Sequence, residues 1–329
     1  MNILEVEGLT KHYPIHAGFL RKEVGRVRAA EDVSFALARG ETLALVGESG
    51  CGKTTVSRCI LRALKPTAGS IRFAAEDGAT IDLAPLSKRA LRPWRRHIQM
   101  IFQDPYASLN PRMMVGDIIA EPMVVNGVPS PERSKRVAEL LDLVGLPAVA
   151  RTRFPHAFSG GQRQRIVIAR ALALNPQLIV ADEPVSALDV SVQAQIINLL
   201  LDLQDRLGLS MLFVAHDLGV VRHVSDRVAV MYVGRLVEVA PTEALYDAPK
   251  HPYTKALLAA VPKADPEMRD LAAAPMGEVA DPANPPPGCA FNPRCPFAVD
   301  RCRTERPSLR DVGGGRMSAC HRAEELETL

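Results

Sequence analysis

The sequence lacks any long hydrophobic run, and no uninterrupted apolar stretch reaches the ~18 residues that a membrane-spanning helix needs. Its first residues also lack the basic segment followed by an apolar core that marks a secretory signal peptide. From these two absences we expect a soluble, cytoplasmic chain that does not itself cross a membrane.

A strong excess of charge of one sign is missing as well. The 40 basic and 37 acidic residues leave a formal net charge of +3. The densest basic cluster, residues 89–96, is most simply a solvated face, and no stripe of Lys and Arg with interleaved aromatic residues is present. Composition therefore predicts no nucleic-acid partner.

The 329 residues provide room for about two domains. Residues 1 to about 40 alternate between polar and apolar side chains, which predicts short strands of an antiparallel layer. Tyr13 lies in this stretch. Its ring can stack on adenine or can be that of a half-buried strand tyrosine, and the residues alone leave both interpretations open.

Residues 47–55 carry the most specific pattern in the chain. The apolar run at residues 42–46 predicts a buried strand before them, and the spacing of apolar residues from Val56 to Leu64 predicts a helix after them. A G-x-x-x-x-G-K-T pattern in this context is typical of a loop that binds a nucleoside triphosphate with Mg²⁺. Lys53 is then expected on the β- and γ-phosphates and Thr54 on Mg²⁺. The predicted loop consists of Gly47, Glu48, Ser49, Gly50, Cys51, Gly52, Lys53, Thr54 and Thr55.

One cysteine, Cys51, lies inside this loop, next to the start of the predicted helix. A helix N-terminus lowers the pKa of a nearby thiol. We therefore expect Cys51 to be alkylated readily.

Two carboxylates follow a second apolar strand. Residues 178–181 predict this strand, and Asp182 and Glu183 come at its carboxyl end, where open α/β sheets bind ligands. Phosphoryl transfer needs a metal ligand and a group that orients and deprotonates the attacking water. We assign Asp182 to Mg²⁺ and Glu183 to the water. Farther upstream, Ser159 with Gln162 has the form of a capping box, so this helix N-terminus is a second anion site.

The chain resembles an ATP-binding-cassette (ABC) ATPase through motifs that occur in the order of that family: the phosphate loop, Gln103, Ser159 to Gln162, Asp182 with Glu183, Ser186 to Asp189, and His216. The resemblance covers about residues 3–245. It implies an α/β fold, a P-loop NTPase cassette with an antiparallel β layer and a helical subdomain inserted at about residues 104–172. It also implies that two cassettes pair head to tail, so that each signature helix caps the γ-phosphate held by the partner.

The resemblance also assigns roles to single residues. Gln103 would contact Mg²⁺ and water, His216 would hold the γ-phosphate, and both would join Glu183 in catalysis. Tyr13 would stack on adenine. The residues that would act across the interface are Ser159, Gly160, Gly161, Gln162 and Asp189.

A narrower resemblance comes from residues 102–112 and from residues 251–254. Both are similar to the F-type ATPase subunit of dipeptide and oligopeptide importers. This implies a D-type ATPase partner, two membrane permeases and a solute-binding protein, with the chain peripheral at the cytoplasmic face of the inner membrane. Importers of nickel chelates or glycosides are the alternative, followed by a soluble ABC ATPase without a transport role.

Residues 246–329 are expected to form a C-terminal extension that is poor in apolar residues. Four of the six cysteines lie here, namely Cys289, Cys295, Cys302 and Cys320. Zinc usually has a Cys-x₂₋₄-Cys knuckle, which is absent, and disulfides are rare in a reducing cytosol. A cubane cluster imposes no single spacing. We therefore predict a [4Fe–4S] cluster on these cysteines, as the peptide-importer resemblance also implies, with zinc or unliganded thiols as alternatives.

Overall fold

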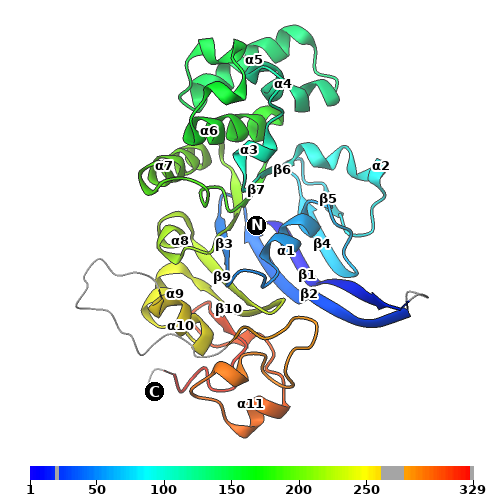
Figure 1. Cartoon of the computed structure of the whole chain (residues 1–329), viewed down its shortest axis with the longest axis vertical. Helices are drawn as coiled ribbons and strands as arrows, with labels where there is room; N and C mark the ends of the chain where they lie inside the picture. Colours follow the sequence, from blue (N-terminus) through cyan, green and yellow to red (C-terminus); the bar gives the residue numbers. More distant parts are fainter. Residues whose placement is uncertain (19–21, 261–277, 327–329) are drawn as a thin grey trace.

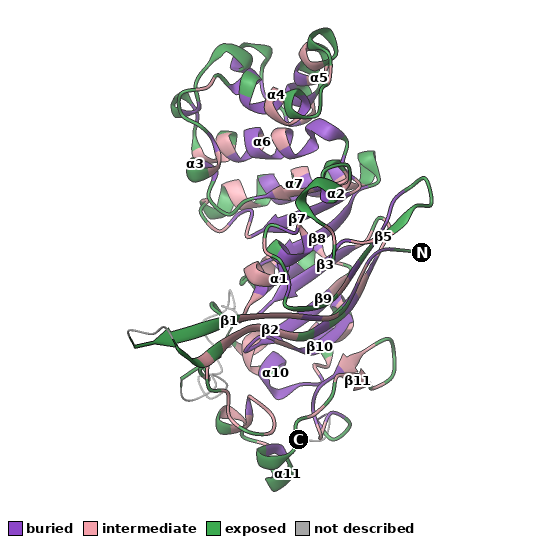
Figure 2. Ribbon diagram, turned by 90° about the vertical axis from the view of Figure 1, so that its right-hand side faces the viewer, coloured by how far each residue is buried: buried purple, intermediate pink, exposed green. Residues whose placement is uncertain are grey.

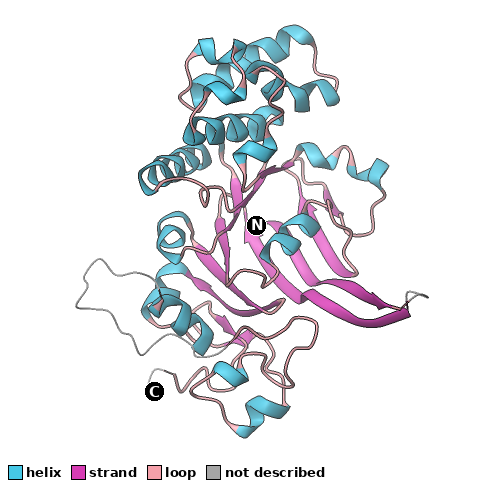
Figure 3. Cartoon of the chain, viewed as in Figure 1, coloured by secondary structure: helices cyan, strands magenta, loops and turns pink. Residues whose placement is uncertain are grey.

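The computed structural model describes residues 1–18, 22–260 and 278–326. Their strands form two sheets, and the helices pack around them (Figure 3). The smaller sheet has the order β2-β1-β4-β5 and only antiparallel pairs. Its strands are β1 (Asn2–Ala17), β2 (Lys22–Ala38), β4 (Ala68–Ala74) and β5 (Thr80–Asp82).

The antiparallel layer is therefore present, but its first two strands are long rather than short, with 16 and 17 residues. Their pairing shifts register at several points, for example between Val6 and Leu9 and between Ile15 and His16. Each bulge inserts a residue and interrupts the alternation of the two faces. This is why the hydrophobic pattern divides one long hairpin into apparently short strands.

The larger sheet has the order β11-β12-β10-β9-β3-β8-β7-β6. Its strands β9, β3, β8, β7 and β6 are parallel to one another, and β10, β12 and β11 continue the sheet in antiparallel pairs. The strands are β3 (Thr42–Val46), β6 (Ile98–Ile101), β7 (Leu178–Asp182), β8 (Ser210–Val214), β9 (Arg227–Tyr232), β10 (Arg235–Pro241), β11 (Arg310–Asp311) and β12 (Met317–Ser318). The predicted buried strands at residues 42–46 and 178–181 are confirmed.

The parallel strands are buried on both faces (Figure 2). On β3, Ala44 and Val46 belong to one hydrophobic core, while Leu43 and Leu45 belong to the other. This double burial explains why these strands appear in the sequence as continuous apolar runs. It also means that polar residues can be placed only at the strand ends, where the site lies.

Helices flank the sheets and occupy one end of the molecule (Figure 1). Between β6 and β7 the chain forms α3 (Pro105–Ser108), α4 (Val115–Val125), α5 (Ser130–Leu143) and α6 (Gly160–Ala171). The remaining α-helices are α1 (Lys53–Ile60), α2 (Lys88–Leu91), α7 (Val190–Leu207), α8 (Leu218–Val224), α9 (Thr242–Asp247), α10 (Pro252–Ala259) and α11 (Asp300–Thr304). None of the helices in the described part of the chain is long and apolar enough to span a membrane.

The C-terminal region lies at the opposite end from α4 and α5 (Figure 1). It joins the larger sheet through β12, which pairs with β10 at Glu238 and Val239. Phe291 is 1% exposed and packs into the same core as β3 and β9. These contacts attach the region to the rest of the chain, beside the loop that follows β3.

Candidate functional site

The predicted phosphate loop connects the end of β3 to the start of α1. Two of its glycines are required by close packing. A Cβ atom on Gly47 would lie 2.2 Å from the carbonyl oxygen of Met231, and one on Gly52 would lie 1.9 Å from that of Ala29. Both glycines also have positive φ angles, 150° and 110°. No other residue type fits these positions without moving the neighbouring backbone.

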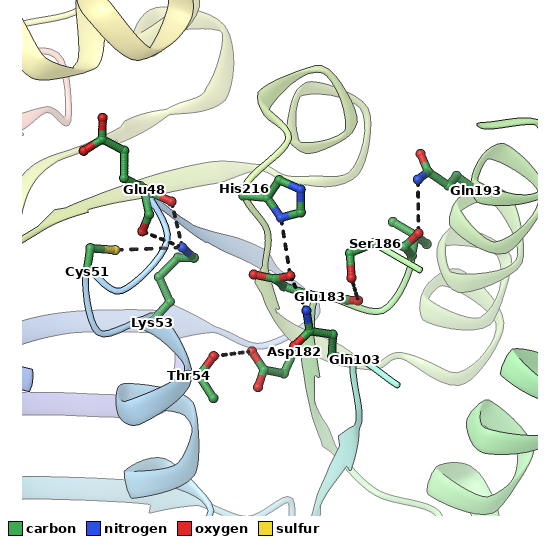
Figure 4. A network of polar contacts seen from close by, with 12 residues as sticks. Glu48, Cys51, Lys53, Thr54, Gln103, Asp182, Glu183, Ser186, Gln193 and His216 are labelled. Atoms are coloured by element: carbon green, nitrogen blue, oxygen red, sulfur yellow. Dashed lines mark hydrogen bonds and ion pairs between the residues drawn. The ribbon is translucent and has the colours of Figure 1, made fainter. Parts of the chain in front are cut away.

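Lys53 points back into the loop (Figure 4). Its Nζ donates hydrogen bonds to the carbonyl oxygens of Gly47 at 2.7 Å and Glu48 at 3.1 Å. The side chain is only 5% exposed. The Lys53 ammonium group thus lies against the carbonyl oxygens of its own loop. Charged phosphate oxygens would bind this group more strongly than these neutral carbonyls do.

The expectation that Cys51 has a lowered pKa is wrong. Its side chain is 2% exposed, and this burial raises the pKa of the thiol, more than the nearby Lys53 lowers it. The sequence indicated the helix N-terminus, but it did not show that Cys51 packs into the core that also contains Leu43 and Leu45. A buried neutral thiol is a poor nucleophile.

Thr54 and Asp182, two of the three predicted Mg²⁺ ligands, are in contact, while Gln103 contacts Glu183. The Thr54 hydroxyl donates to Asp182 Oδ1 at 3.2 Å (Figure 4). Burial raises the pKa of Asp182, and the Thr54 hydroxyl opposes that shift. A hydroxyl and a carboxylate that face each other beside a phosphate loop are the donor set by which such sites hold Mg²⁺. The residues present therefore fit the ion.

The three predicted catalytic residues lie together, and Gln103 and His216 both contact Glu183 (Figure 4). Gln103, which follows β6, donates from Nε2 to Glu183 Oε2 at 2.8 Å. His216, which follows β8, places Nδ1 3.4 Å from the same oxygen. Three parallel strands thus deliver these side chains to one edge of the sheet, as the strand-end argument predicts.

The remaining predicted residues lie apart from this cluster. Ser159 and Gln162 form the predicted capping box, with Ser159 N–H donating to Gln162 Oε1 at 3.1 Å. Asp189 is the N-cap residue of α7, and Tyr13 is 37% exposed on β1. Within residues 1–18, 22–260 and 278–326, no hydrogen bond or ion pair joins any of these four to the phosphate loop.

The C-terminal cysteines do not form the predicted metal centre. In the described part of the chain, no group of three or more His, Cys, Asp or Glu residues is placed to hold a metal ion. The four cysteines are free and line a small, mainly apolar cavity. Burial raises the pKa of Cys289 to about 11 and that of Cys320 to about 12, so the surroundings favour neutral thiols over thiolates. The [4Fe–4S] prediction is therefore wrong, and among the described residues no ligand set supports zinc either.

Sequence reasoning missed two residues that reach the phosphate loop from the C-terminal side. Arg294 forms a two-fold ion pair with the Glu48 carboxylate, and the Tyr253 hydroxyl accepts a hydrogen bond from Glu48 N–H. Tyr253 belongs to residues 251–254, which the sequence analysis used only for a resemblance. Arg294 lies in no motif, so only the fold brings it to the site.

Similarity to known proteins identifies the family of this chain. A family model described as ABC transporter matches residues 30–186. A peptide ABC transporter ATP-binding protein of Sinorhizobium fredii, named as probable, is 54% identical over 97% of this chain and 89% of its own length. The chain belongs to the ABC transporter ATP-binding proteins. This ABC ATPase therefore binds ATP with Mg²⁺ and hydrolyses it.

A second family model, the C-terminal region of oligopeptide/dipeptide transporters, matches residues 237–302 of the ATPase. The oligopeptide transport protein AppF of Bacillus subtilis is 50% identical over 97% of both chains. The dipeptide transport protein DppF of Haemophilus influenzae is 49% identical over 97% of this chain and 96% of its own.

Solved structures show the same cassette fold. A dimeric post-hydrolysis state of the cassette MJ0796, bound to ADP and phosphate, has a TM-score of 0.62 at 29% identity, covering 73% of this chain and 98% of that one. CbiO1 of Clostridium perfringens, part of a transporter complex, has a TM-score of 0.63 at 28% identity, covering 75% of this chain and 91% of that one.

Proposed function

We propose that the ATPase powers the import of peptides through a membrane permease. The observation that carries this proposal is the match of residues 237–302 to the C-terminal region of oligopeptide/dipeptide transporters, together with about 50% identity to AppF and DppF over nearly the whole chain. The partners would be two permease subunits and a solute-binding protein. The ATPase would then be peripheral, at the cytoplasmic face of the inner membrane.

The geometry supports a division of work within one nucleotide site. Lys53 would leave the carbonyls of the loop to bind the β- and γ-phosphates. Thr54 and Asp182 would hold Mg²⁺, which neutralises charge that develops on the phosphates. Glu183 would accept a proton from the attacking water, with Gln103 and His216 fixing the carboxylate oxygen that does so. The shared Glu183 Oε2, 2.8 Å from Gln103 and 3.4 Å from His216, supports this arrangement.

The second half of the site would come from another cassette. The capping box at Ser159 and Gln162 is exposed and makes no contact with the chain's own phosphate loop among the described residues. We infer that α3 to α6, with the flanking residues 104–172, form the helical subdomain of residues 1–245, and that residues 246–329 form the extension, of which 261–277 and 327–329 lie outside the described residues. The D-type subunit would receive Ser159, Gly160, Gly161, Gln162 and Asp189 on its nucleotide, while Tyr13 would stack on the adenine of this chain.

The test is reconstitution of the ATPase with its permeases, partner ATPase and solute-binding protein in vesicles. Radiolabelled dipeptides and oligopeptides should accumulate only with ATP and only with the wild-type chain, whereas Lys53→Ala should abolish uptake. Accumulation of a nickel chelate or a glycoside, with no uptake of any peptide, would refute the peptide assignment while leaving the ATPase assignment intact.

A further inference from the structure

The C-terminal region holds the phosphate loop through Glu48, the first residue after Gly47. Nη1 and Nη2 of Arg294 each lie 2.9 Å from a different oxygen of the Glu48 carboxylate. The Arg294 side chain is 6% exposed and that of Glu48 is 25% exposed. A bidentate pair of this kind is both stronger and more directional than a single contact, and its burial reduces screening by salt.

A second contact fixes the backbone of the same residue. Glu48 N–H donates to the Tyr253 hydroxyl at 2.9 Å. Tyr253 is fully buried, and its ring centroid lies 4.6 Å from that of Tyr232 and 5.4 Å from that of Phe291. Burial raises the pKa of Tyr253, which keeps its hydroxyl neutral. The buried hydroxyl therefore holds the backbone of the loop in place at Glu48.

The position of Arg294 is set by the same aromatic residues. Its guanidinium carbon lies 5.6 Å from the ring centroid of Phe291 and 5.8 Å from that of Tyr232, within the range of cation–π attraction. Because these rings belong to the packed core, they help to fix the guanidinium beside Glu48.

Glu48 also connects this anchor to Lys53. Its carbonyl oxygen accepts a hydrogen bond from Lys53 Nζ at 3.1 Å. Contacts therefore run from Arg294 and Tyr253 through Glu48 to the lysine expected on the phosphates. The ion pair with Arg294 also neutralises the negative charge of Glu48. An unpaired carboxylate at position 48 would lie beside a polyanionic nucleotide and repel it.

We propose that Arg294 and Tyr253 are positioning residues for ATP. Arg294 neutralises the Glu48 carboxylate and Tyr253 fixes the Glu48 backbone, so that the phosphate loop accepts the triphosphate. The C-terminal region thus sets the affinity of the ATPase for its nucleotide. The proposal rests on the assignment of residues 47–55 as the phosphate site, which Lys53→Ala tests separately.

The decisive experiment compares ATP affinity of the purified full chain carrying Arg294→Ala with that of the double variant Arg294→Ala/Glu48→Gln. The single variant should bind ATP about tenfold more weakly. The double variant should recover to within about threefold of wild type, because no unpaired charge remains. In the assembled complex, the loss from Arg294→Ala should appear as a raised KM for ATP rather than as a lowered kcat.

Arg301→Ala is the matched control. Arg301 lies in the same region, on α11, and pairs with Glu305 at 2.7 Å on the exposed surface. Its removal should leave the ATP affinity unchanged. Wild-type affinity of Arg294→Ala, or a double variant as weak as the single one, would overturn the proposal.

Tyr253→Phe provides a second test if Arg294→Ala does not fold. It keeps the ring in the core and removes only the hydroxyl that accepts the Glu48 N–H. We expect ATP affinity to fall about three- to fivefold. Unchanged affinity in a variant with a wild-type melting temperature would show that the hydroxyl does not position the loop.

Discussion

At the scale of single residues, Glu183 has an unusual backbone. Its φ angle is +49°, in the left-handed region that costs a residue with a side chain free energy. Glu183 N–H donates to the carbonyl oxygen of Val214 at 2.9 Å, and its own carbonyl accepts the Ser186 hydroxyl at 3.1 Å. These bonds hold the strained turn after β7, which directs the carboxylate toward Gln103 and His216.

The first prediction concerns Glu183→Gln. Glutamine has the same shape and leaves the Thr54–Asp182 pair and the loop intact, but it cannot accept a proton from water. ATP affinity should stay within about threefold of wild type, and the hydrolysis rate should fall by at least about 100-fold. Nucleotide titration and single-turnover hydrolysis measure the two quantities. Hydrolysis at a wild-type rate would show that Glu183 is not the base.

Lys53→Ala should give the opposite result, which is the second prediction. The buried ammonium group is the main positive charge inside the loop, so its loss should weaken ATP binding itself by about 100-fold. Equilibrium titration with ATP and Mg²⁺ measures this. Unweakened binding would contradict the assignment of residues 47–55 as the phosphate site.

The residues of the site could be predicted from the sequence where the chemistry depends on neighbours along the chain. Lys53 and Thr54 lie in one short motif, and Asp182 and Glu183 end one apolar strand. The state of Cys51 could not be predicted, because its pKa depends on burial by distant segments. The C-terminal cysteines show the same limit, since their count and grouping said nothing about whether their sulfur atoms would face one ion.

At the scale of elements, β10 carries a buried acid. Glu238 is fully buried, and its Oε1 accepts the Lys250 N–H at 2.6 Å. Burial raises its pKa more than Thr254, the backbone N–H groups of Lys250 and His251, and Arg316 lower it. Burial raises the pKa of Glu238 from 4.5 to about 7. The neighbouring His251 is fully buried too, and its pKa is lowered to about 3, so it stays neutral in the same range. Glu238 is also one of the two residues at which β10 pairs with β12.

The third prediction follows from this shift. Between pH 4.5 and 7 the folded state retains a proton on Glu238 that the unfolded chain has lost, so stability falls as the pH rises. The destabilisation above pH 7 reaches at most about 3 kcal/mol. Glu238→Gln removes the titration. Its melting temperature should therefore exceed that of wild type more at pH 8 than at pH 5, and an equal difference at both pH values would contradict the raised pKa.

The elements themselves could be predicted where they are buried on both faces, as β3 and β7 are. The hairpin of β1 and β2 could not, because its bulges interrupt the alternation that marks a strand. The two short strands β11 and β12 were missed for another reason. Each has two residues, and pairing alone makes them strands: β12 pairs with β10, and β11 pairs with β12.

At the scale of the whole molecule, the N-terminus of α6 lies apart from the phosphate loop of its own chain. The N-terminus of this helix carries the Ser159 capping box but contacts no phosphate-loop residue in the described part of the chain. The cassette MJ0796, which is similar in fold, is dimeric in a post-hydrolysis state with ADP and phosphate. A second cassette that brought its own nucleotide to α6 would place an anion at this exposed helix N-terminus, which is the proposal tested next.

The fourth prediction is that Ser159→Arg abolishes hydrolysis at the site whose phosphate loop belongs to the partner cassette. The arginine side chain would fill the space where the helix N-terminus meets the γ-phosphate, and the cap would be lost at a cost of about 1 kcal/mol. Hydrolysis at the chain's own Lys53 should persist, because that loop receives the signature helix of the unchanged partner. Complexes that combine this variant with a wild-type partner, and the reverse, allow each site to be assayed alone.

Ser87→Arg separates the loss of a helix cap from the loss of the interface. Ser87 is also an N-cap residue, and its hydroxyl accepts the Ala90 N–H at 3.3 Å at the start of α2. Its replacement removes a cap and adds the same bulk and charge, yet α2 belongs to no part of the proposed site. Ser87→Arg should therefore lower the melting temperature and leave both sites active. If Ser159→Arg instead inactivates the site that contains its own Lys53, the two halves act within one chain and the head-to-tail pairing is refuted.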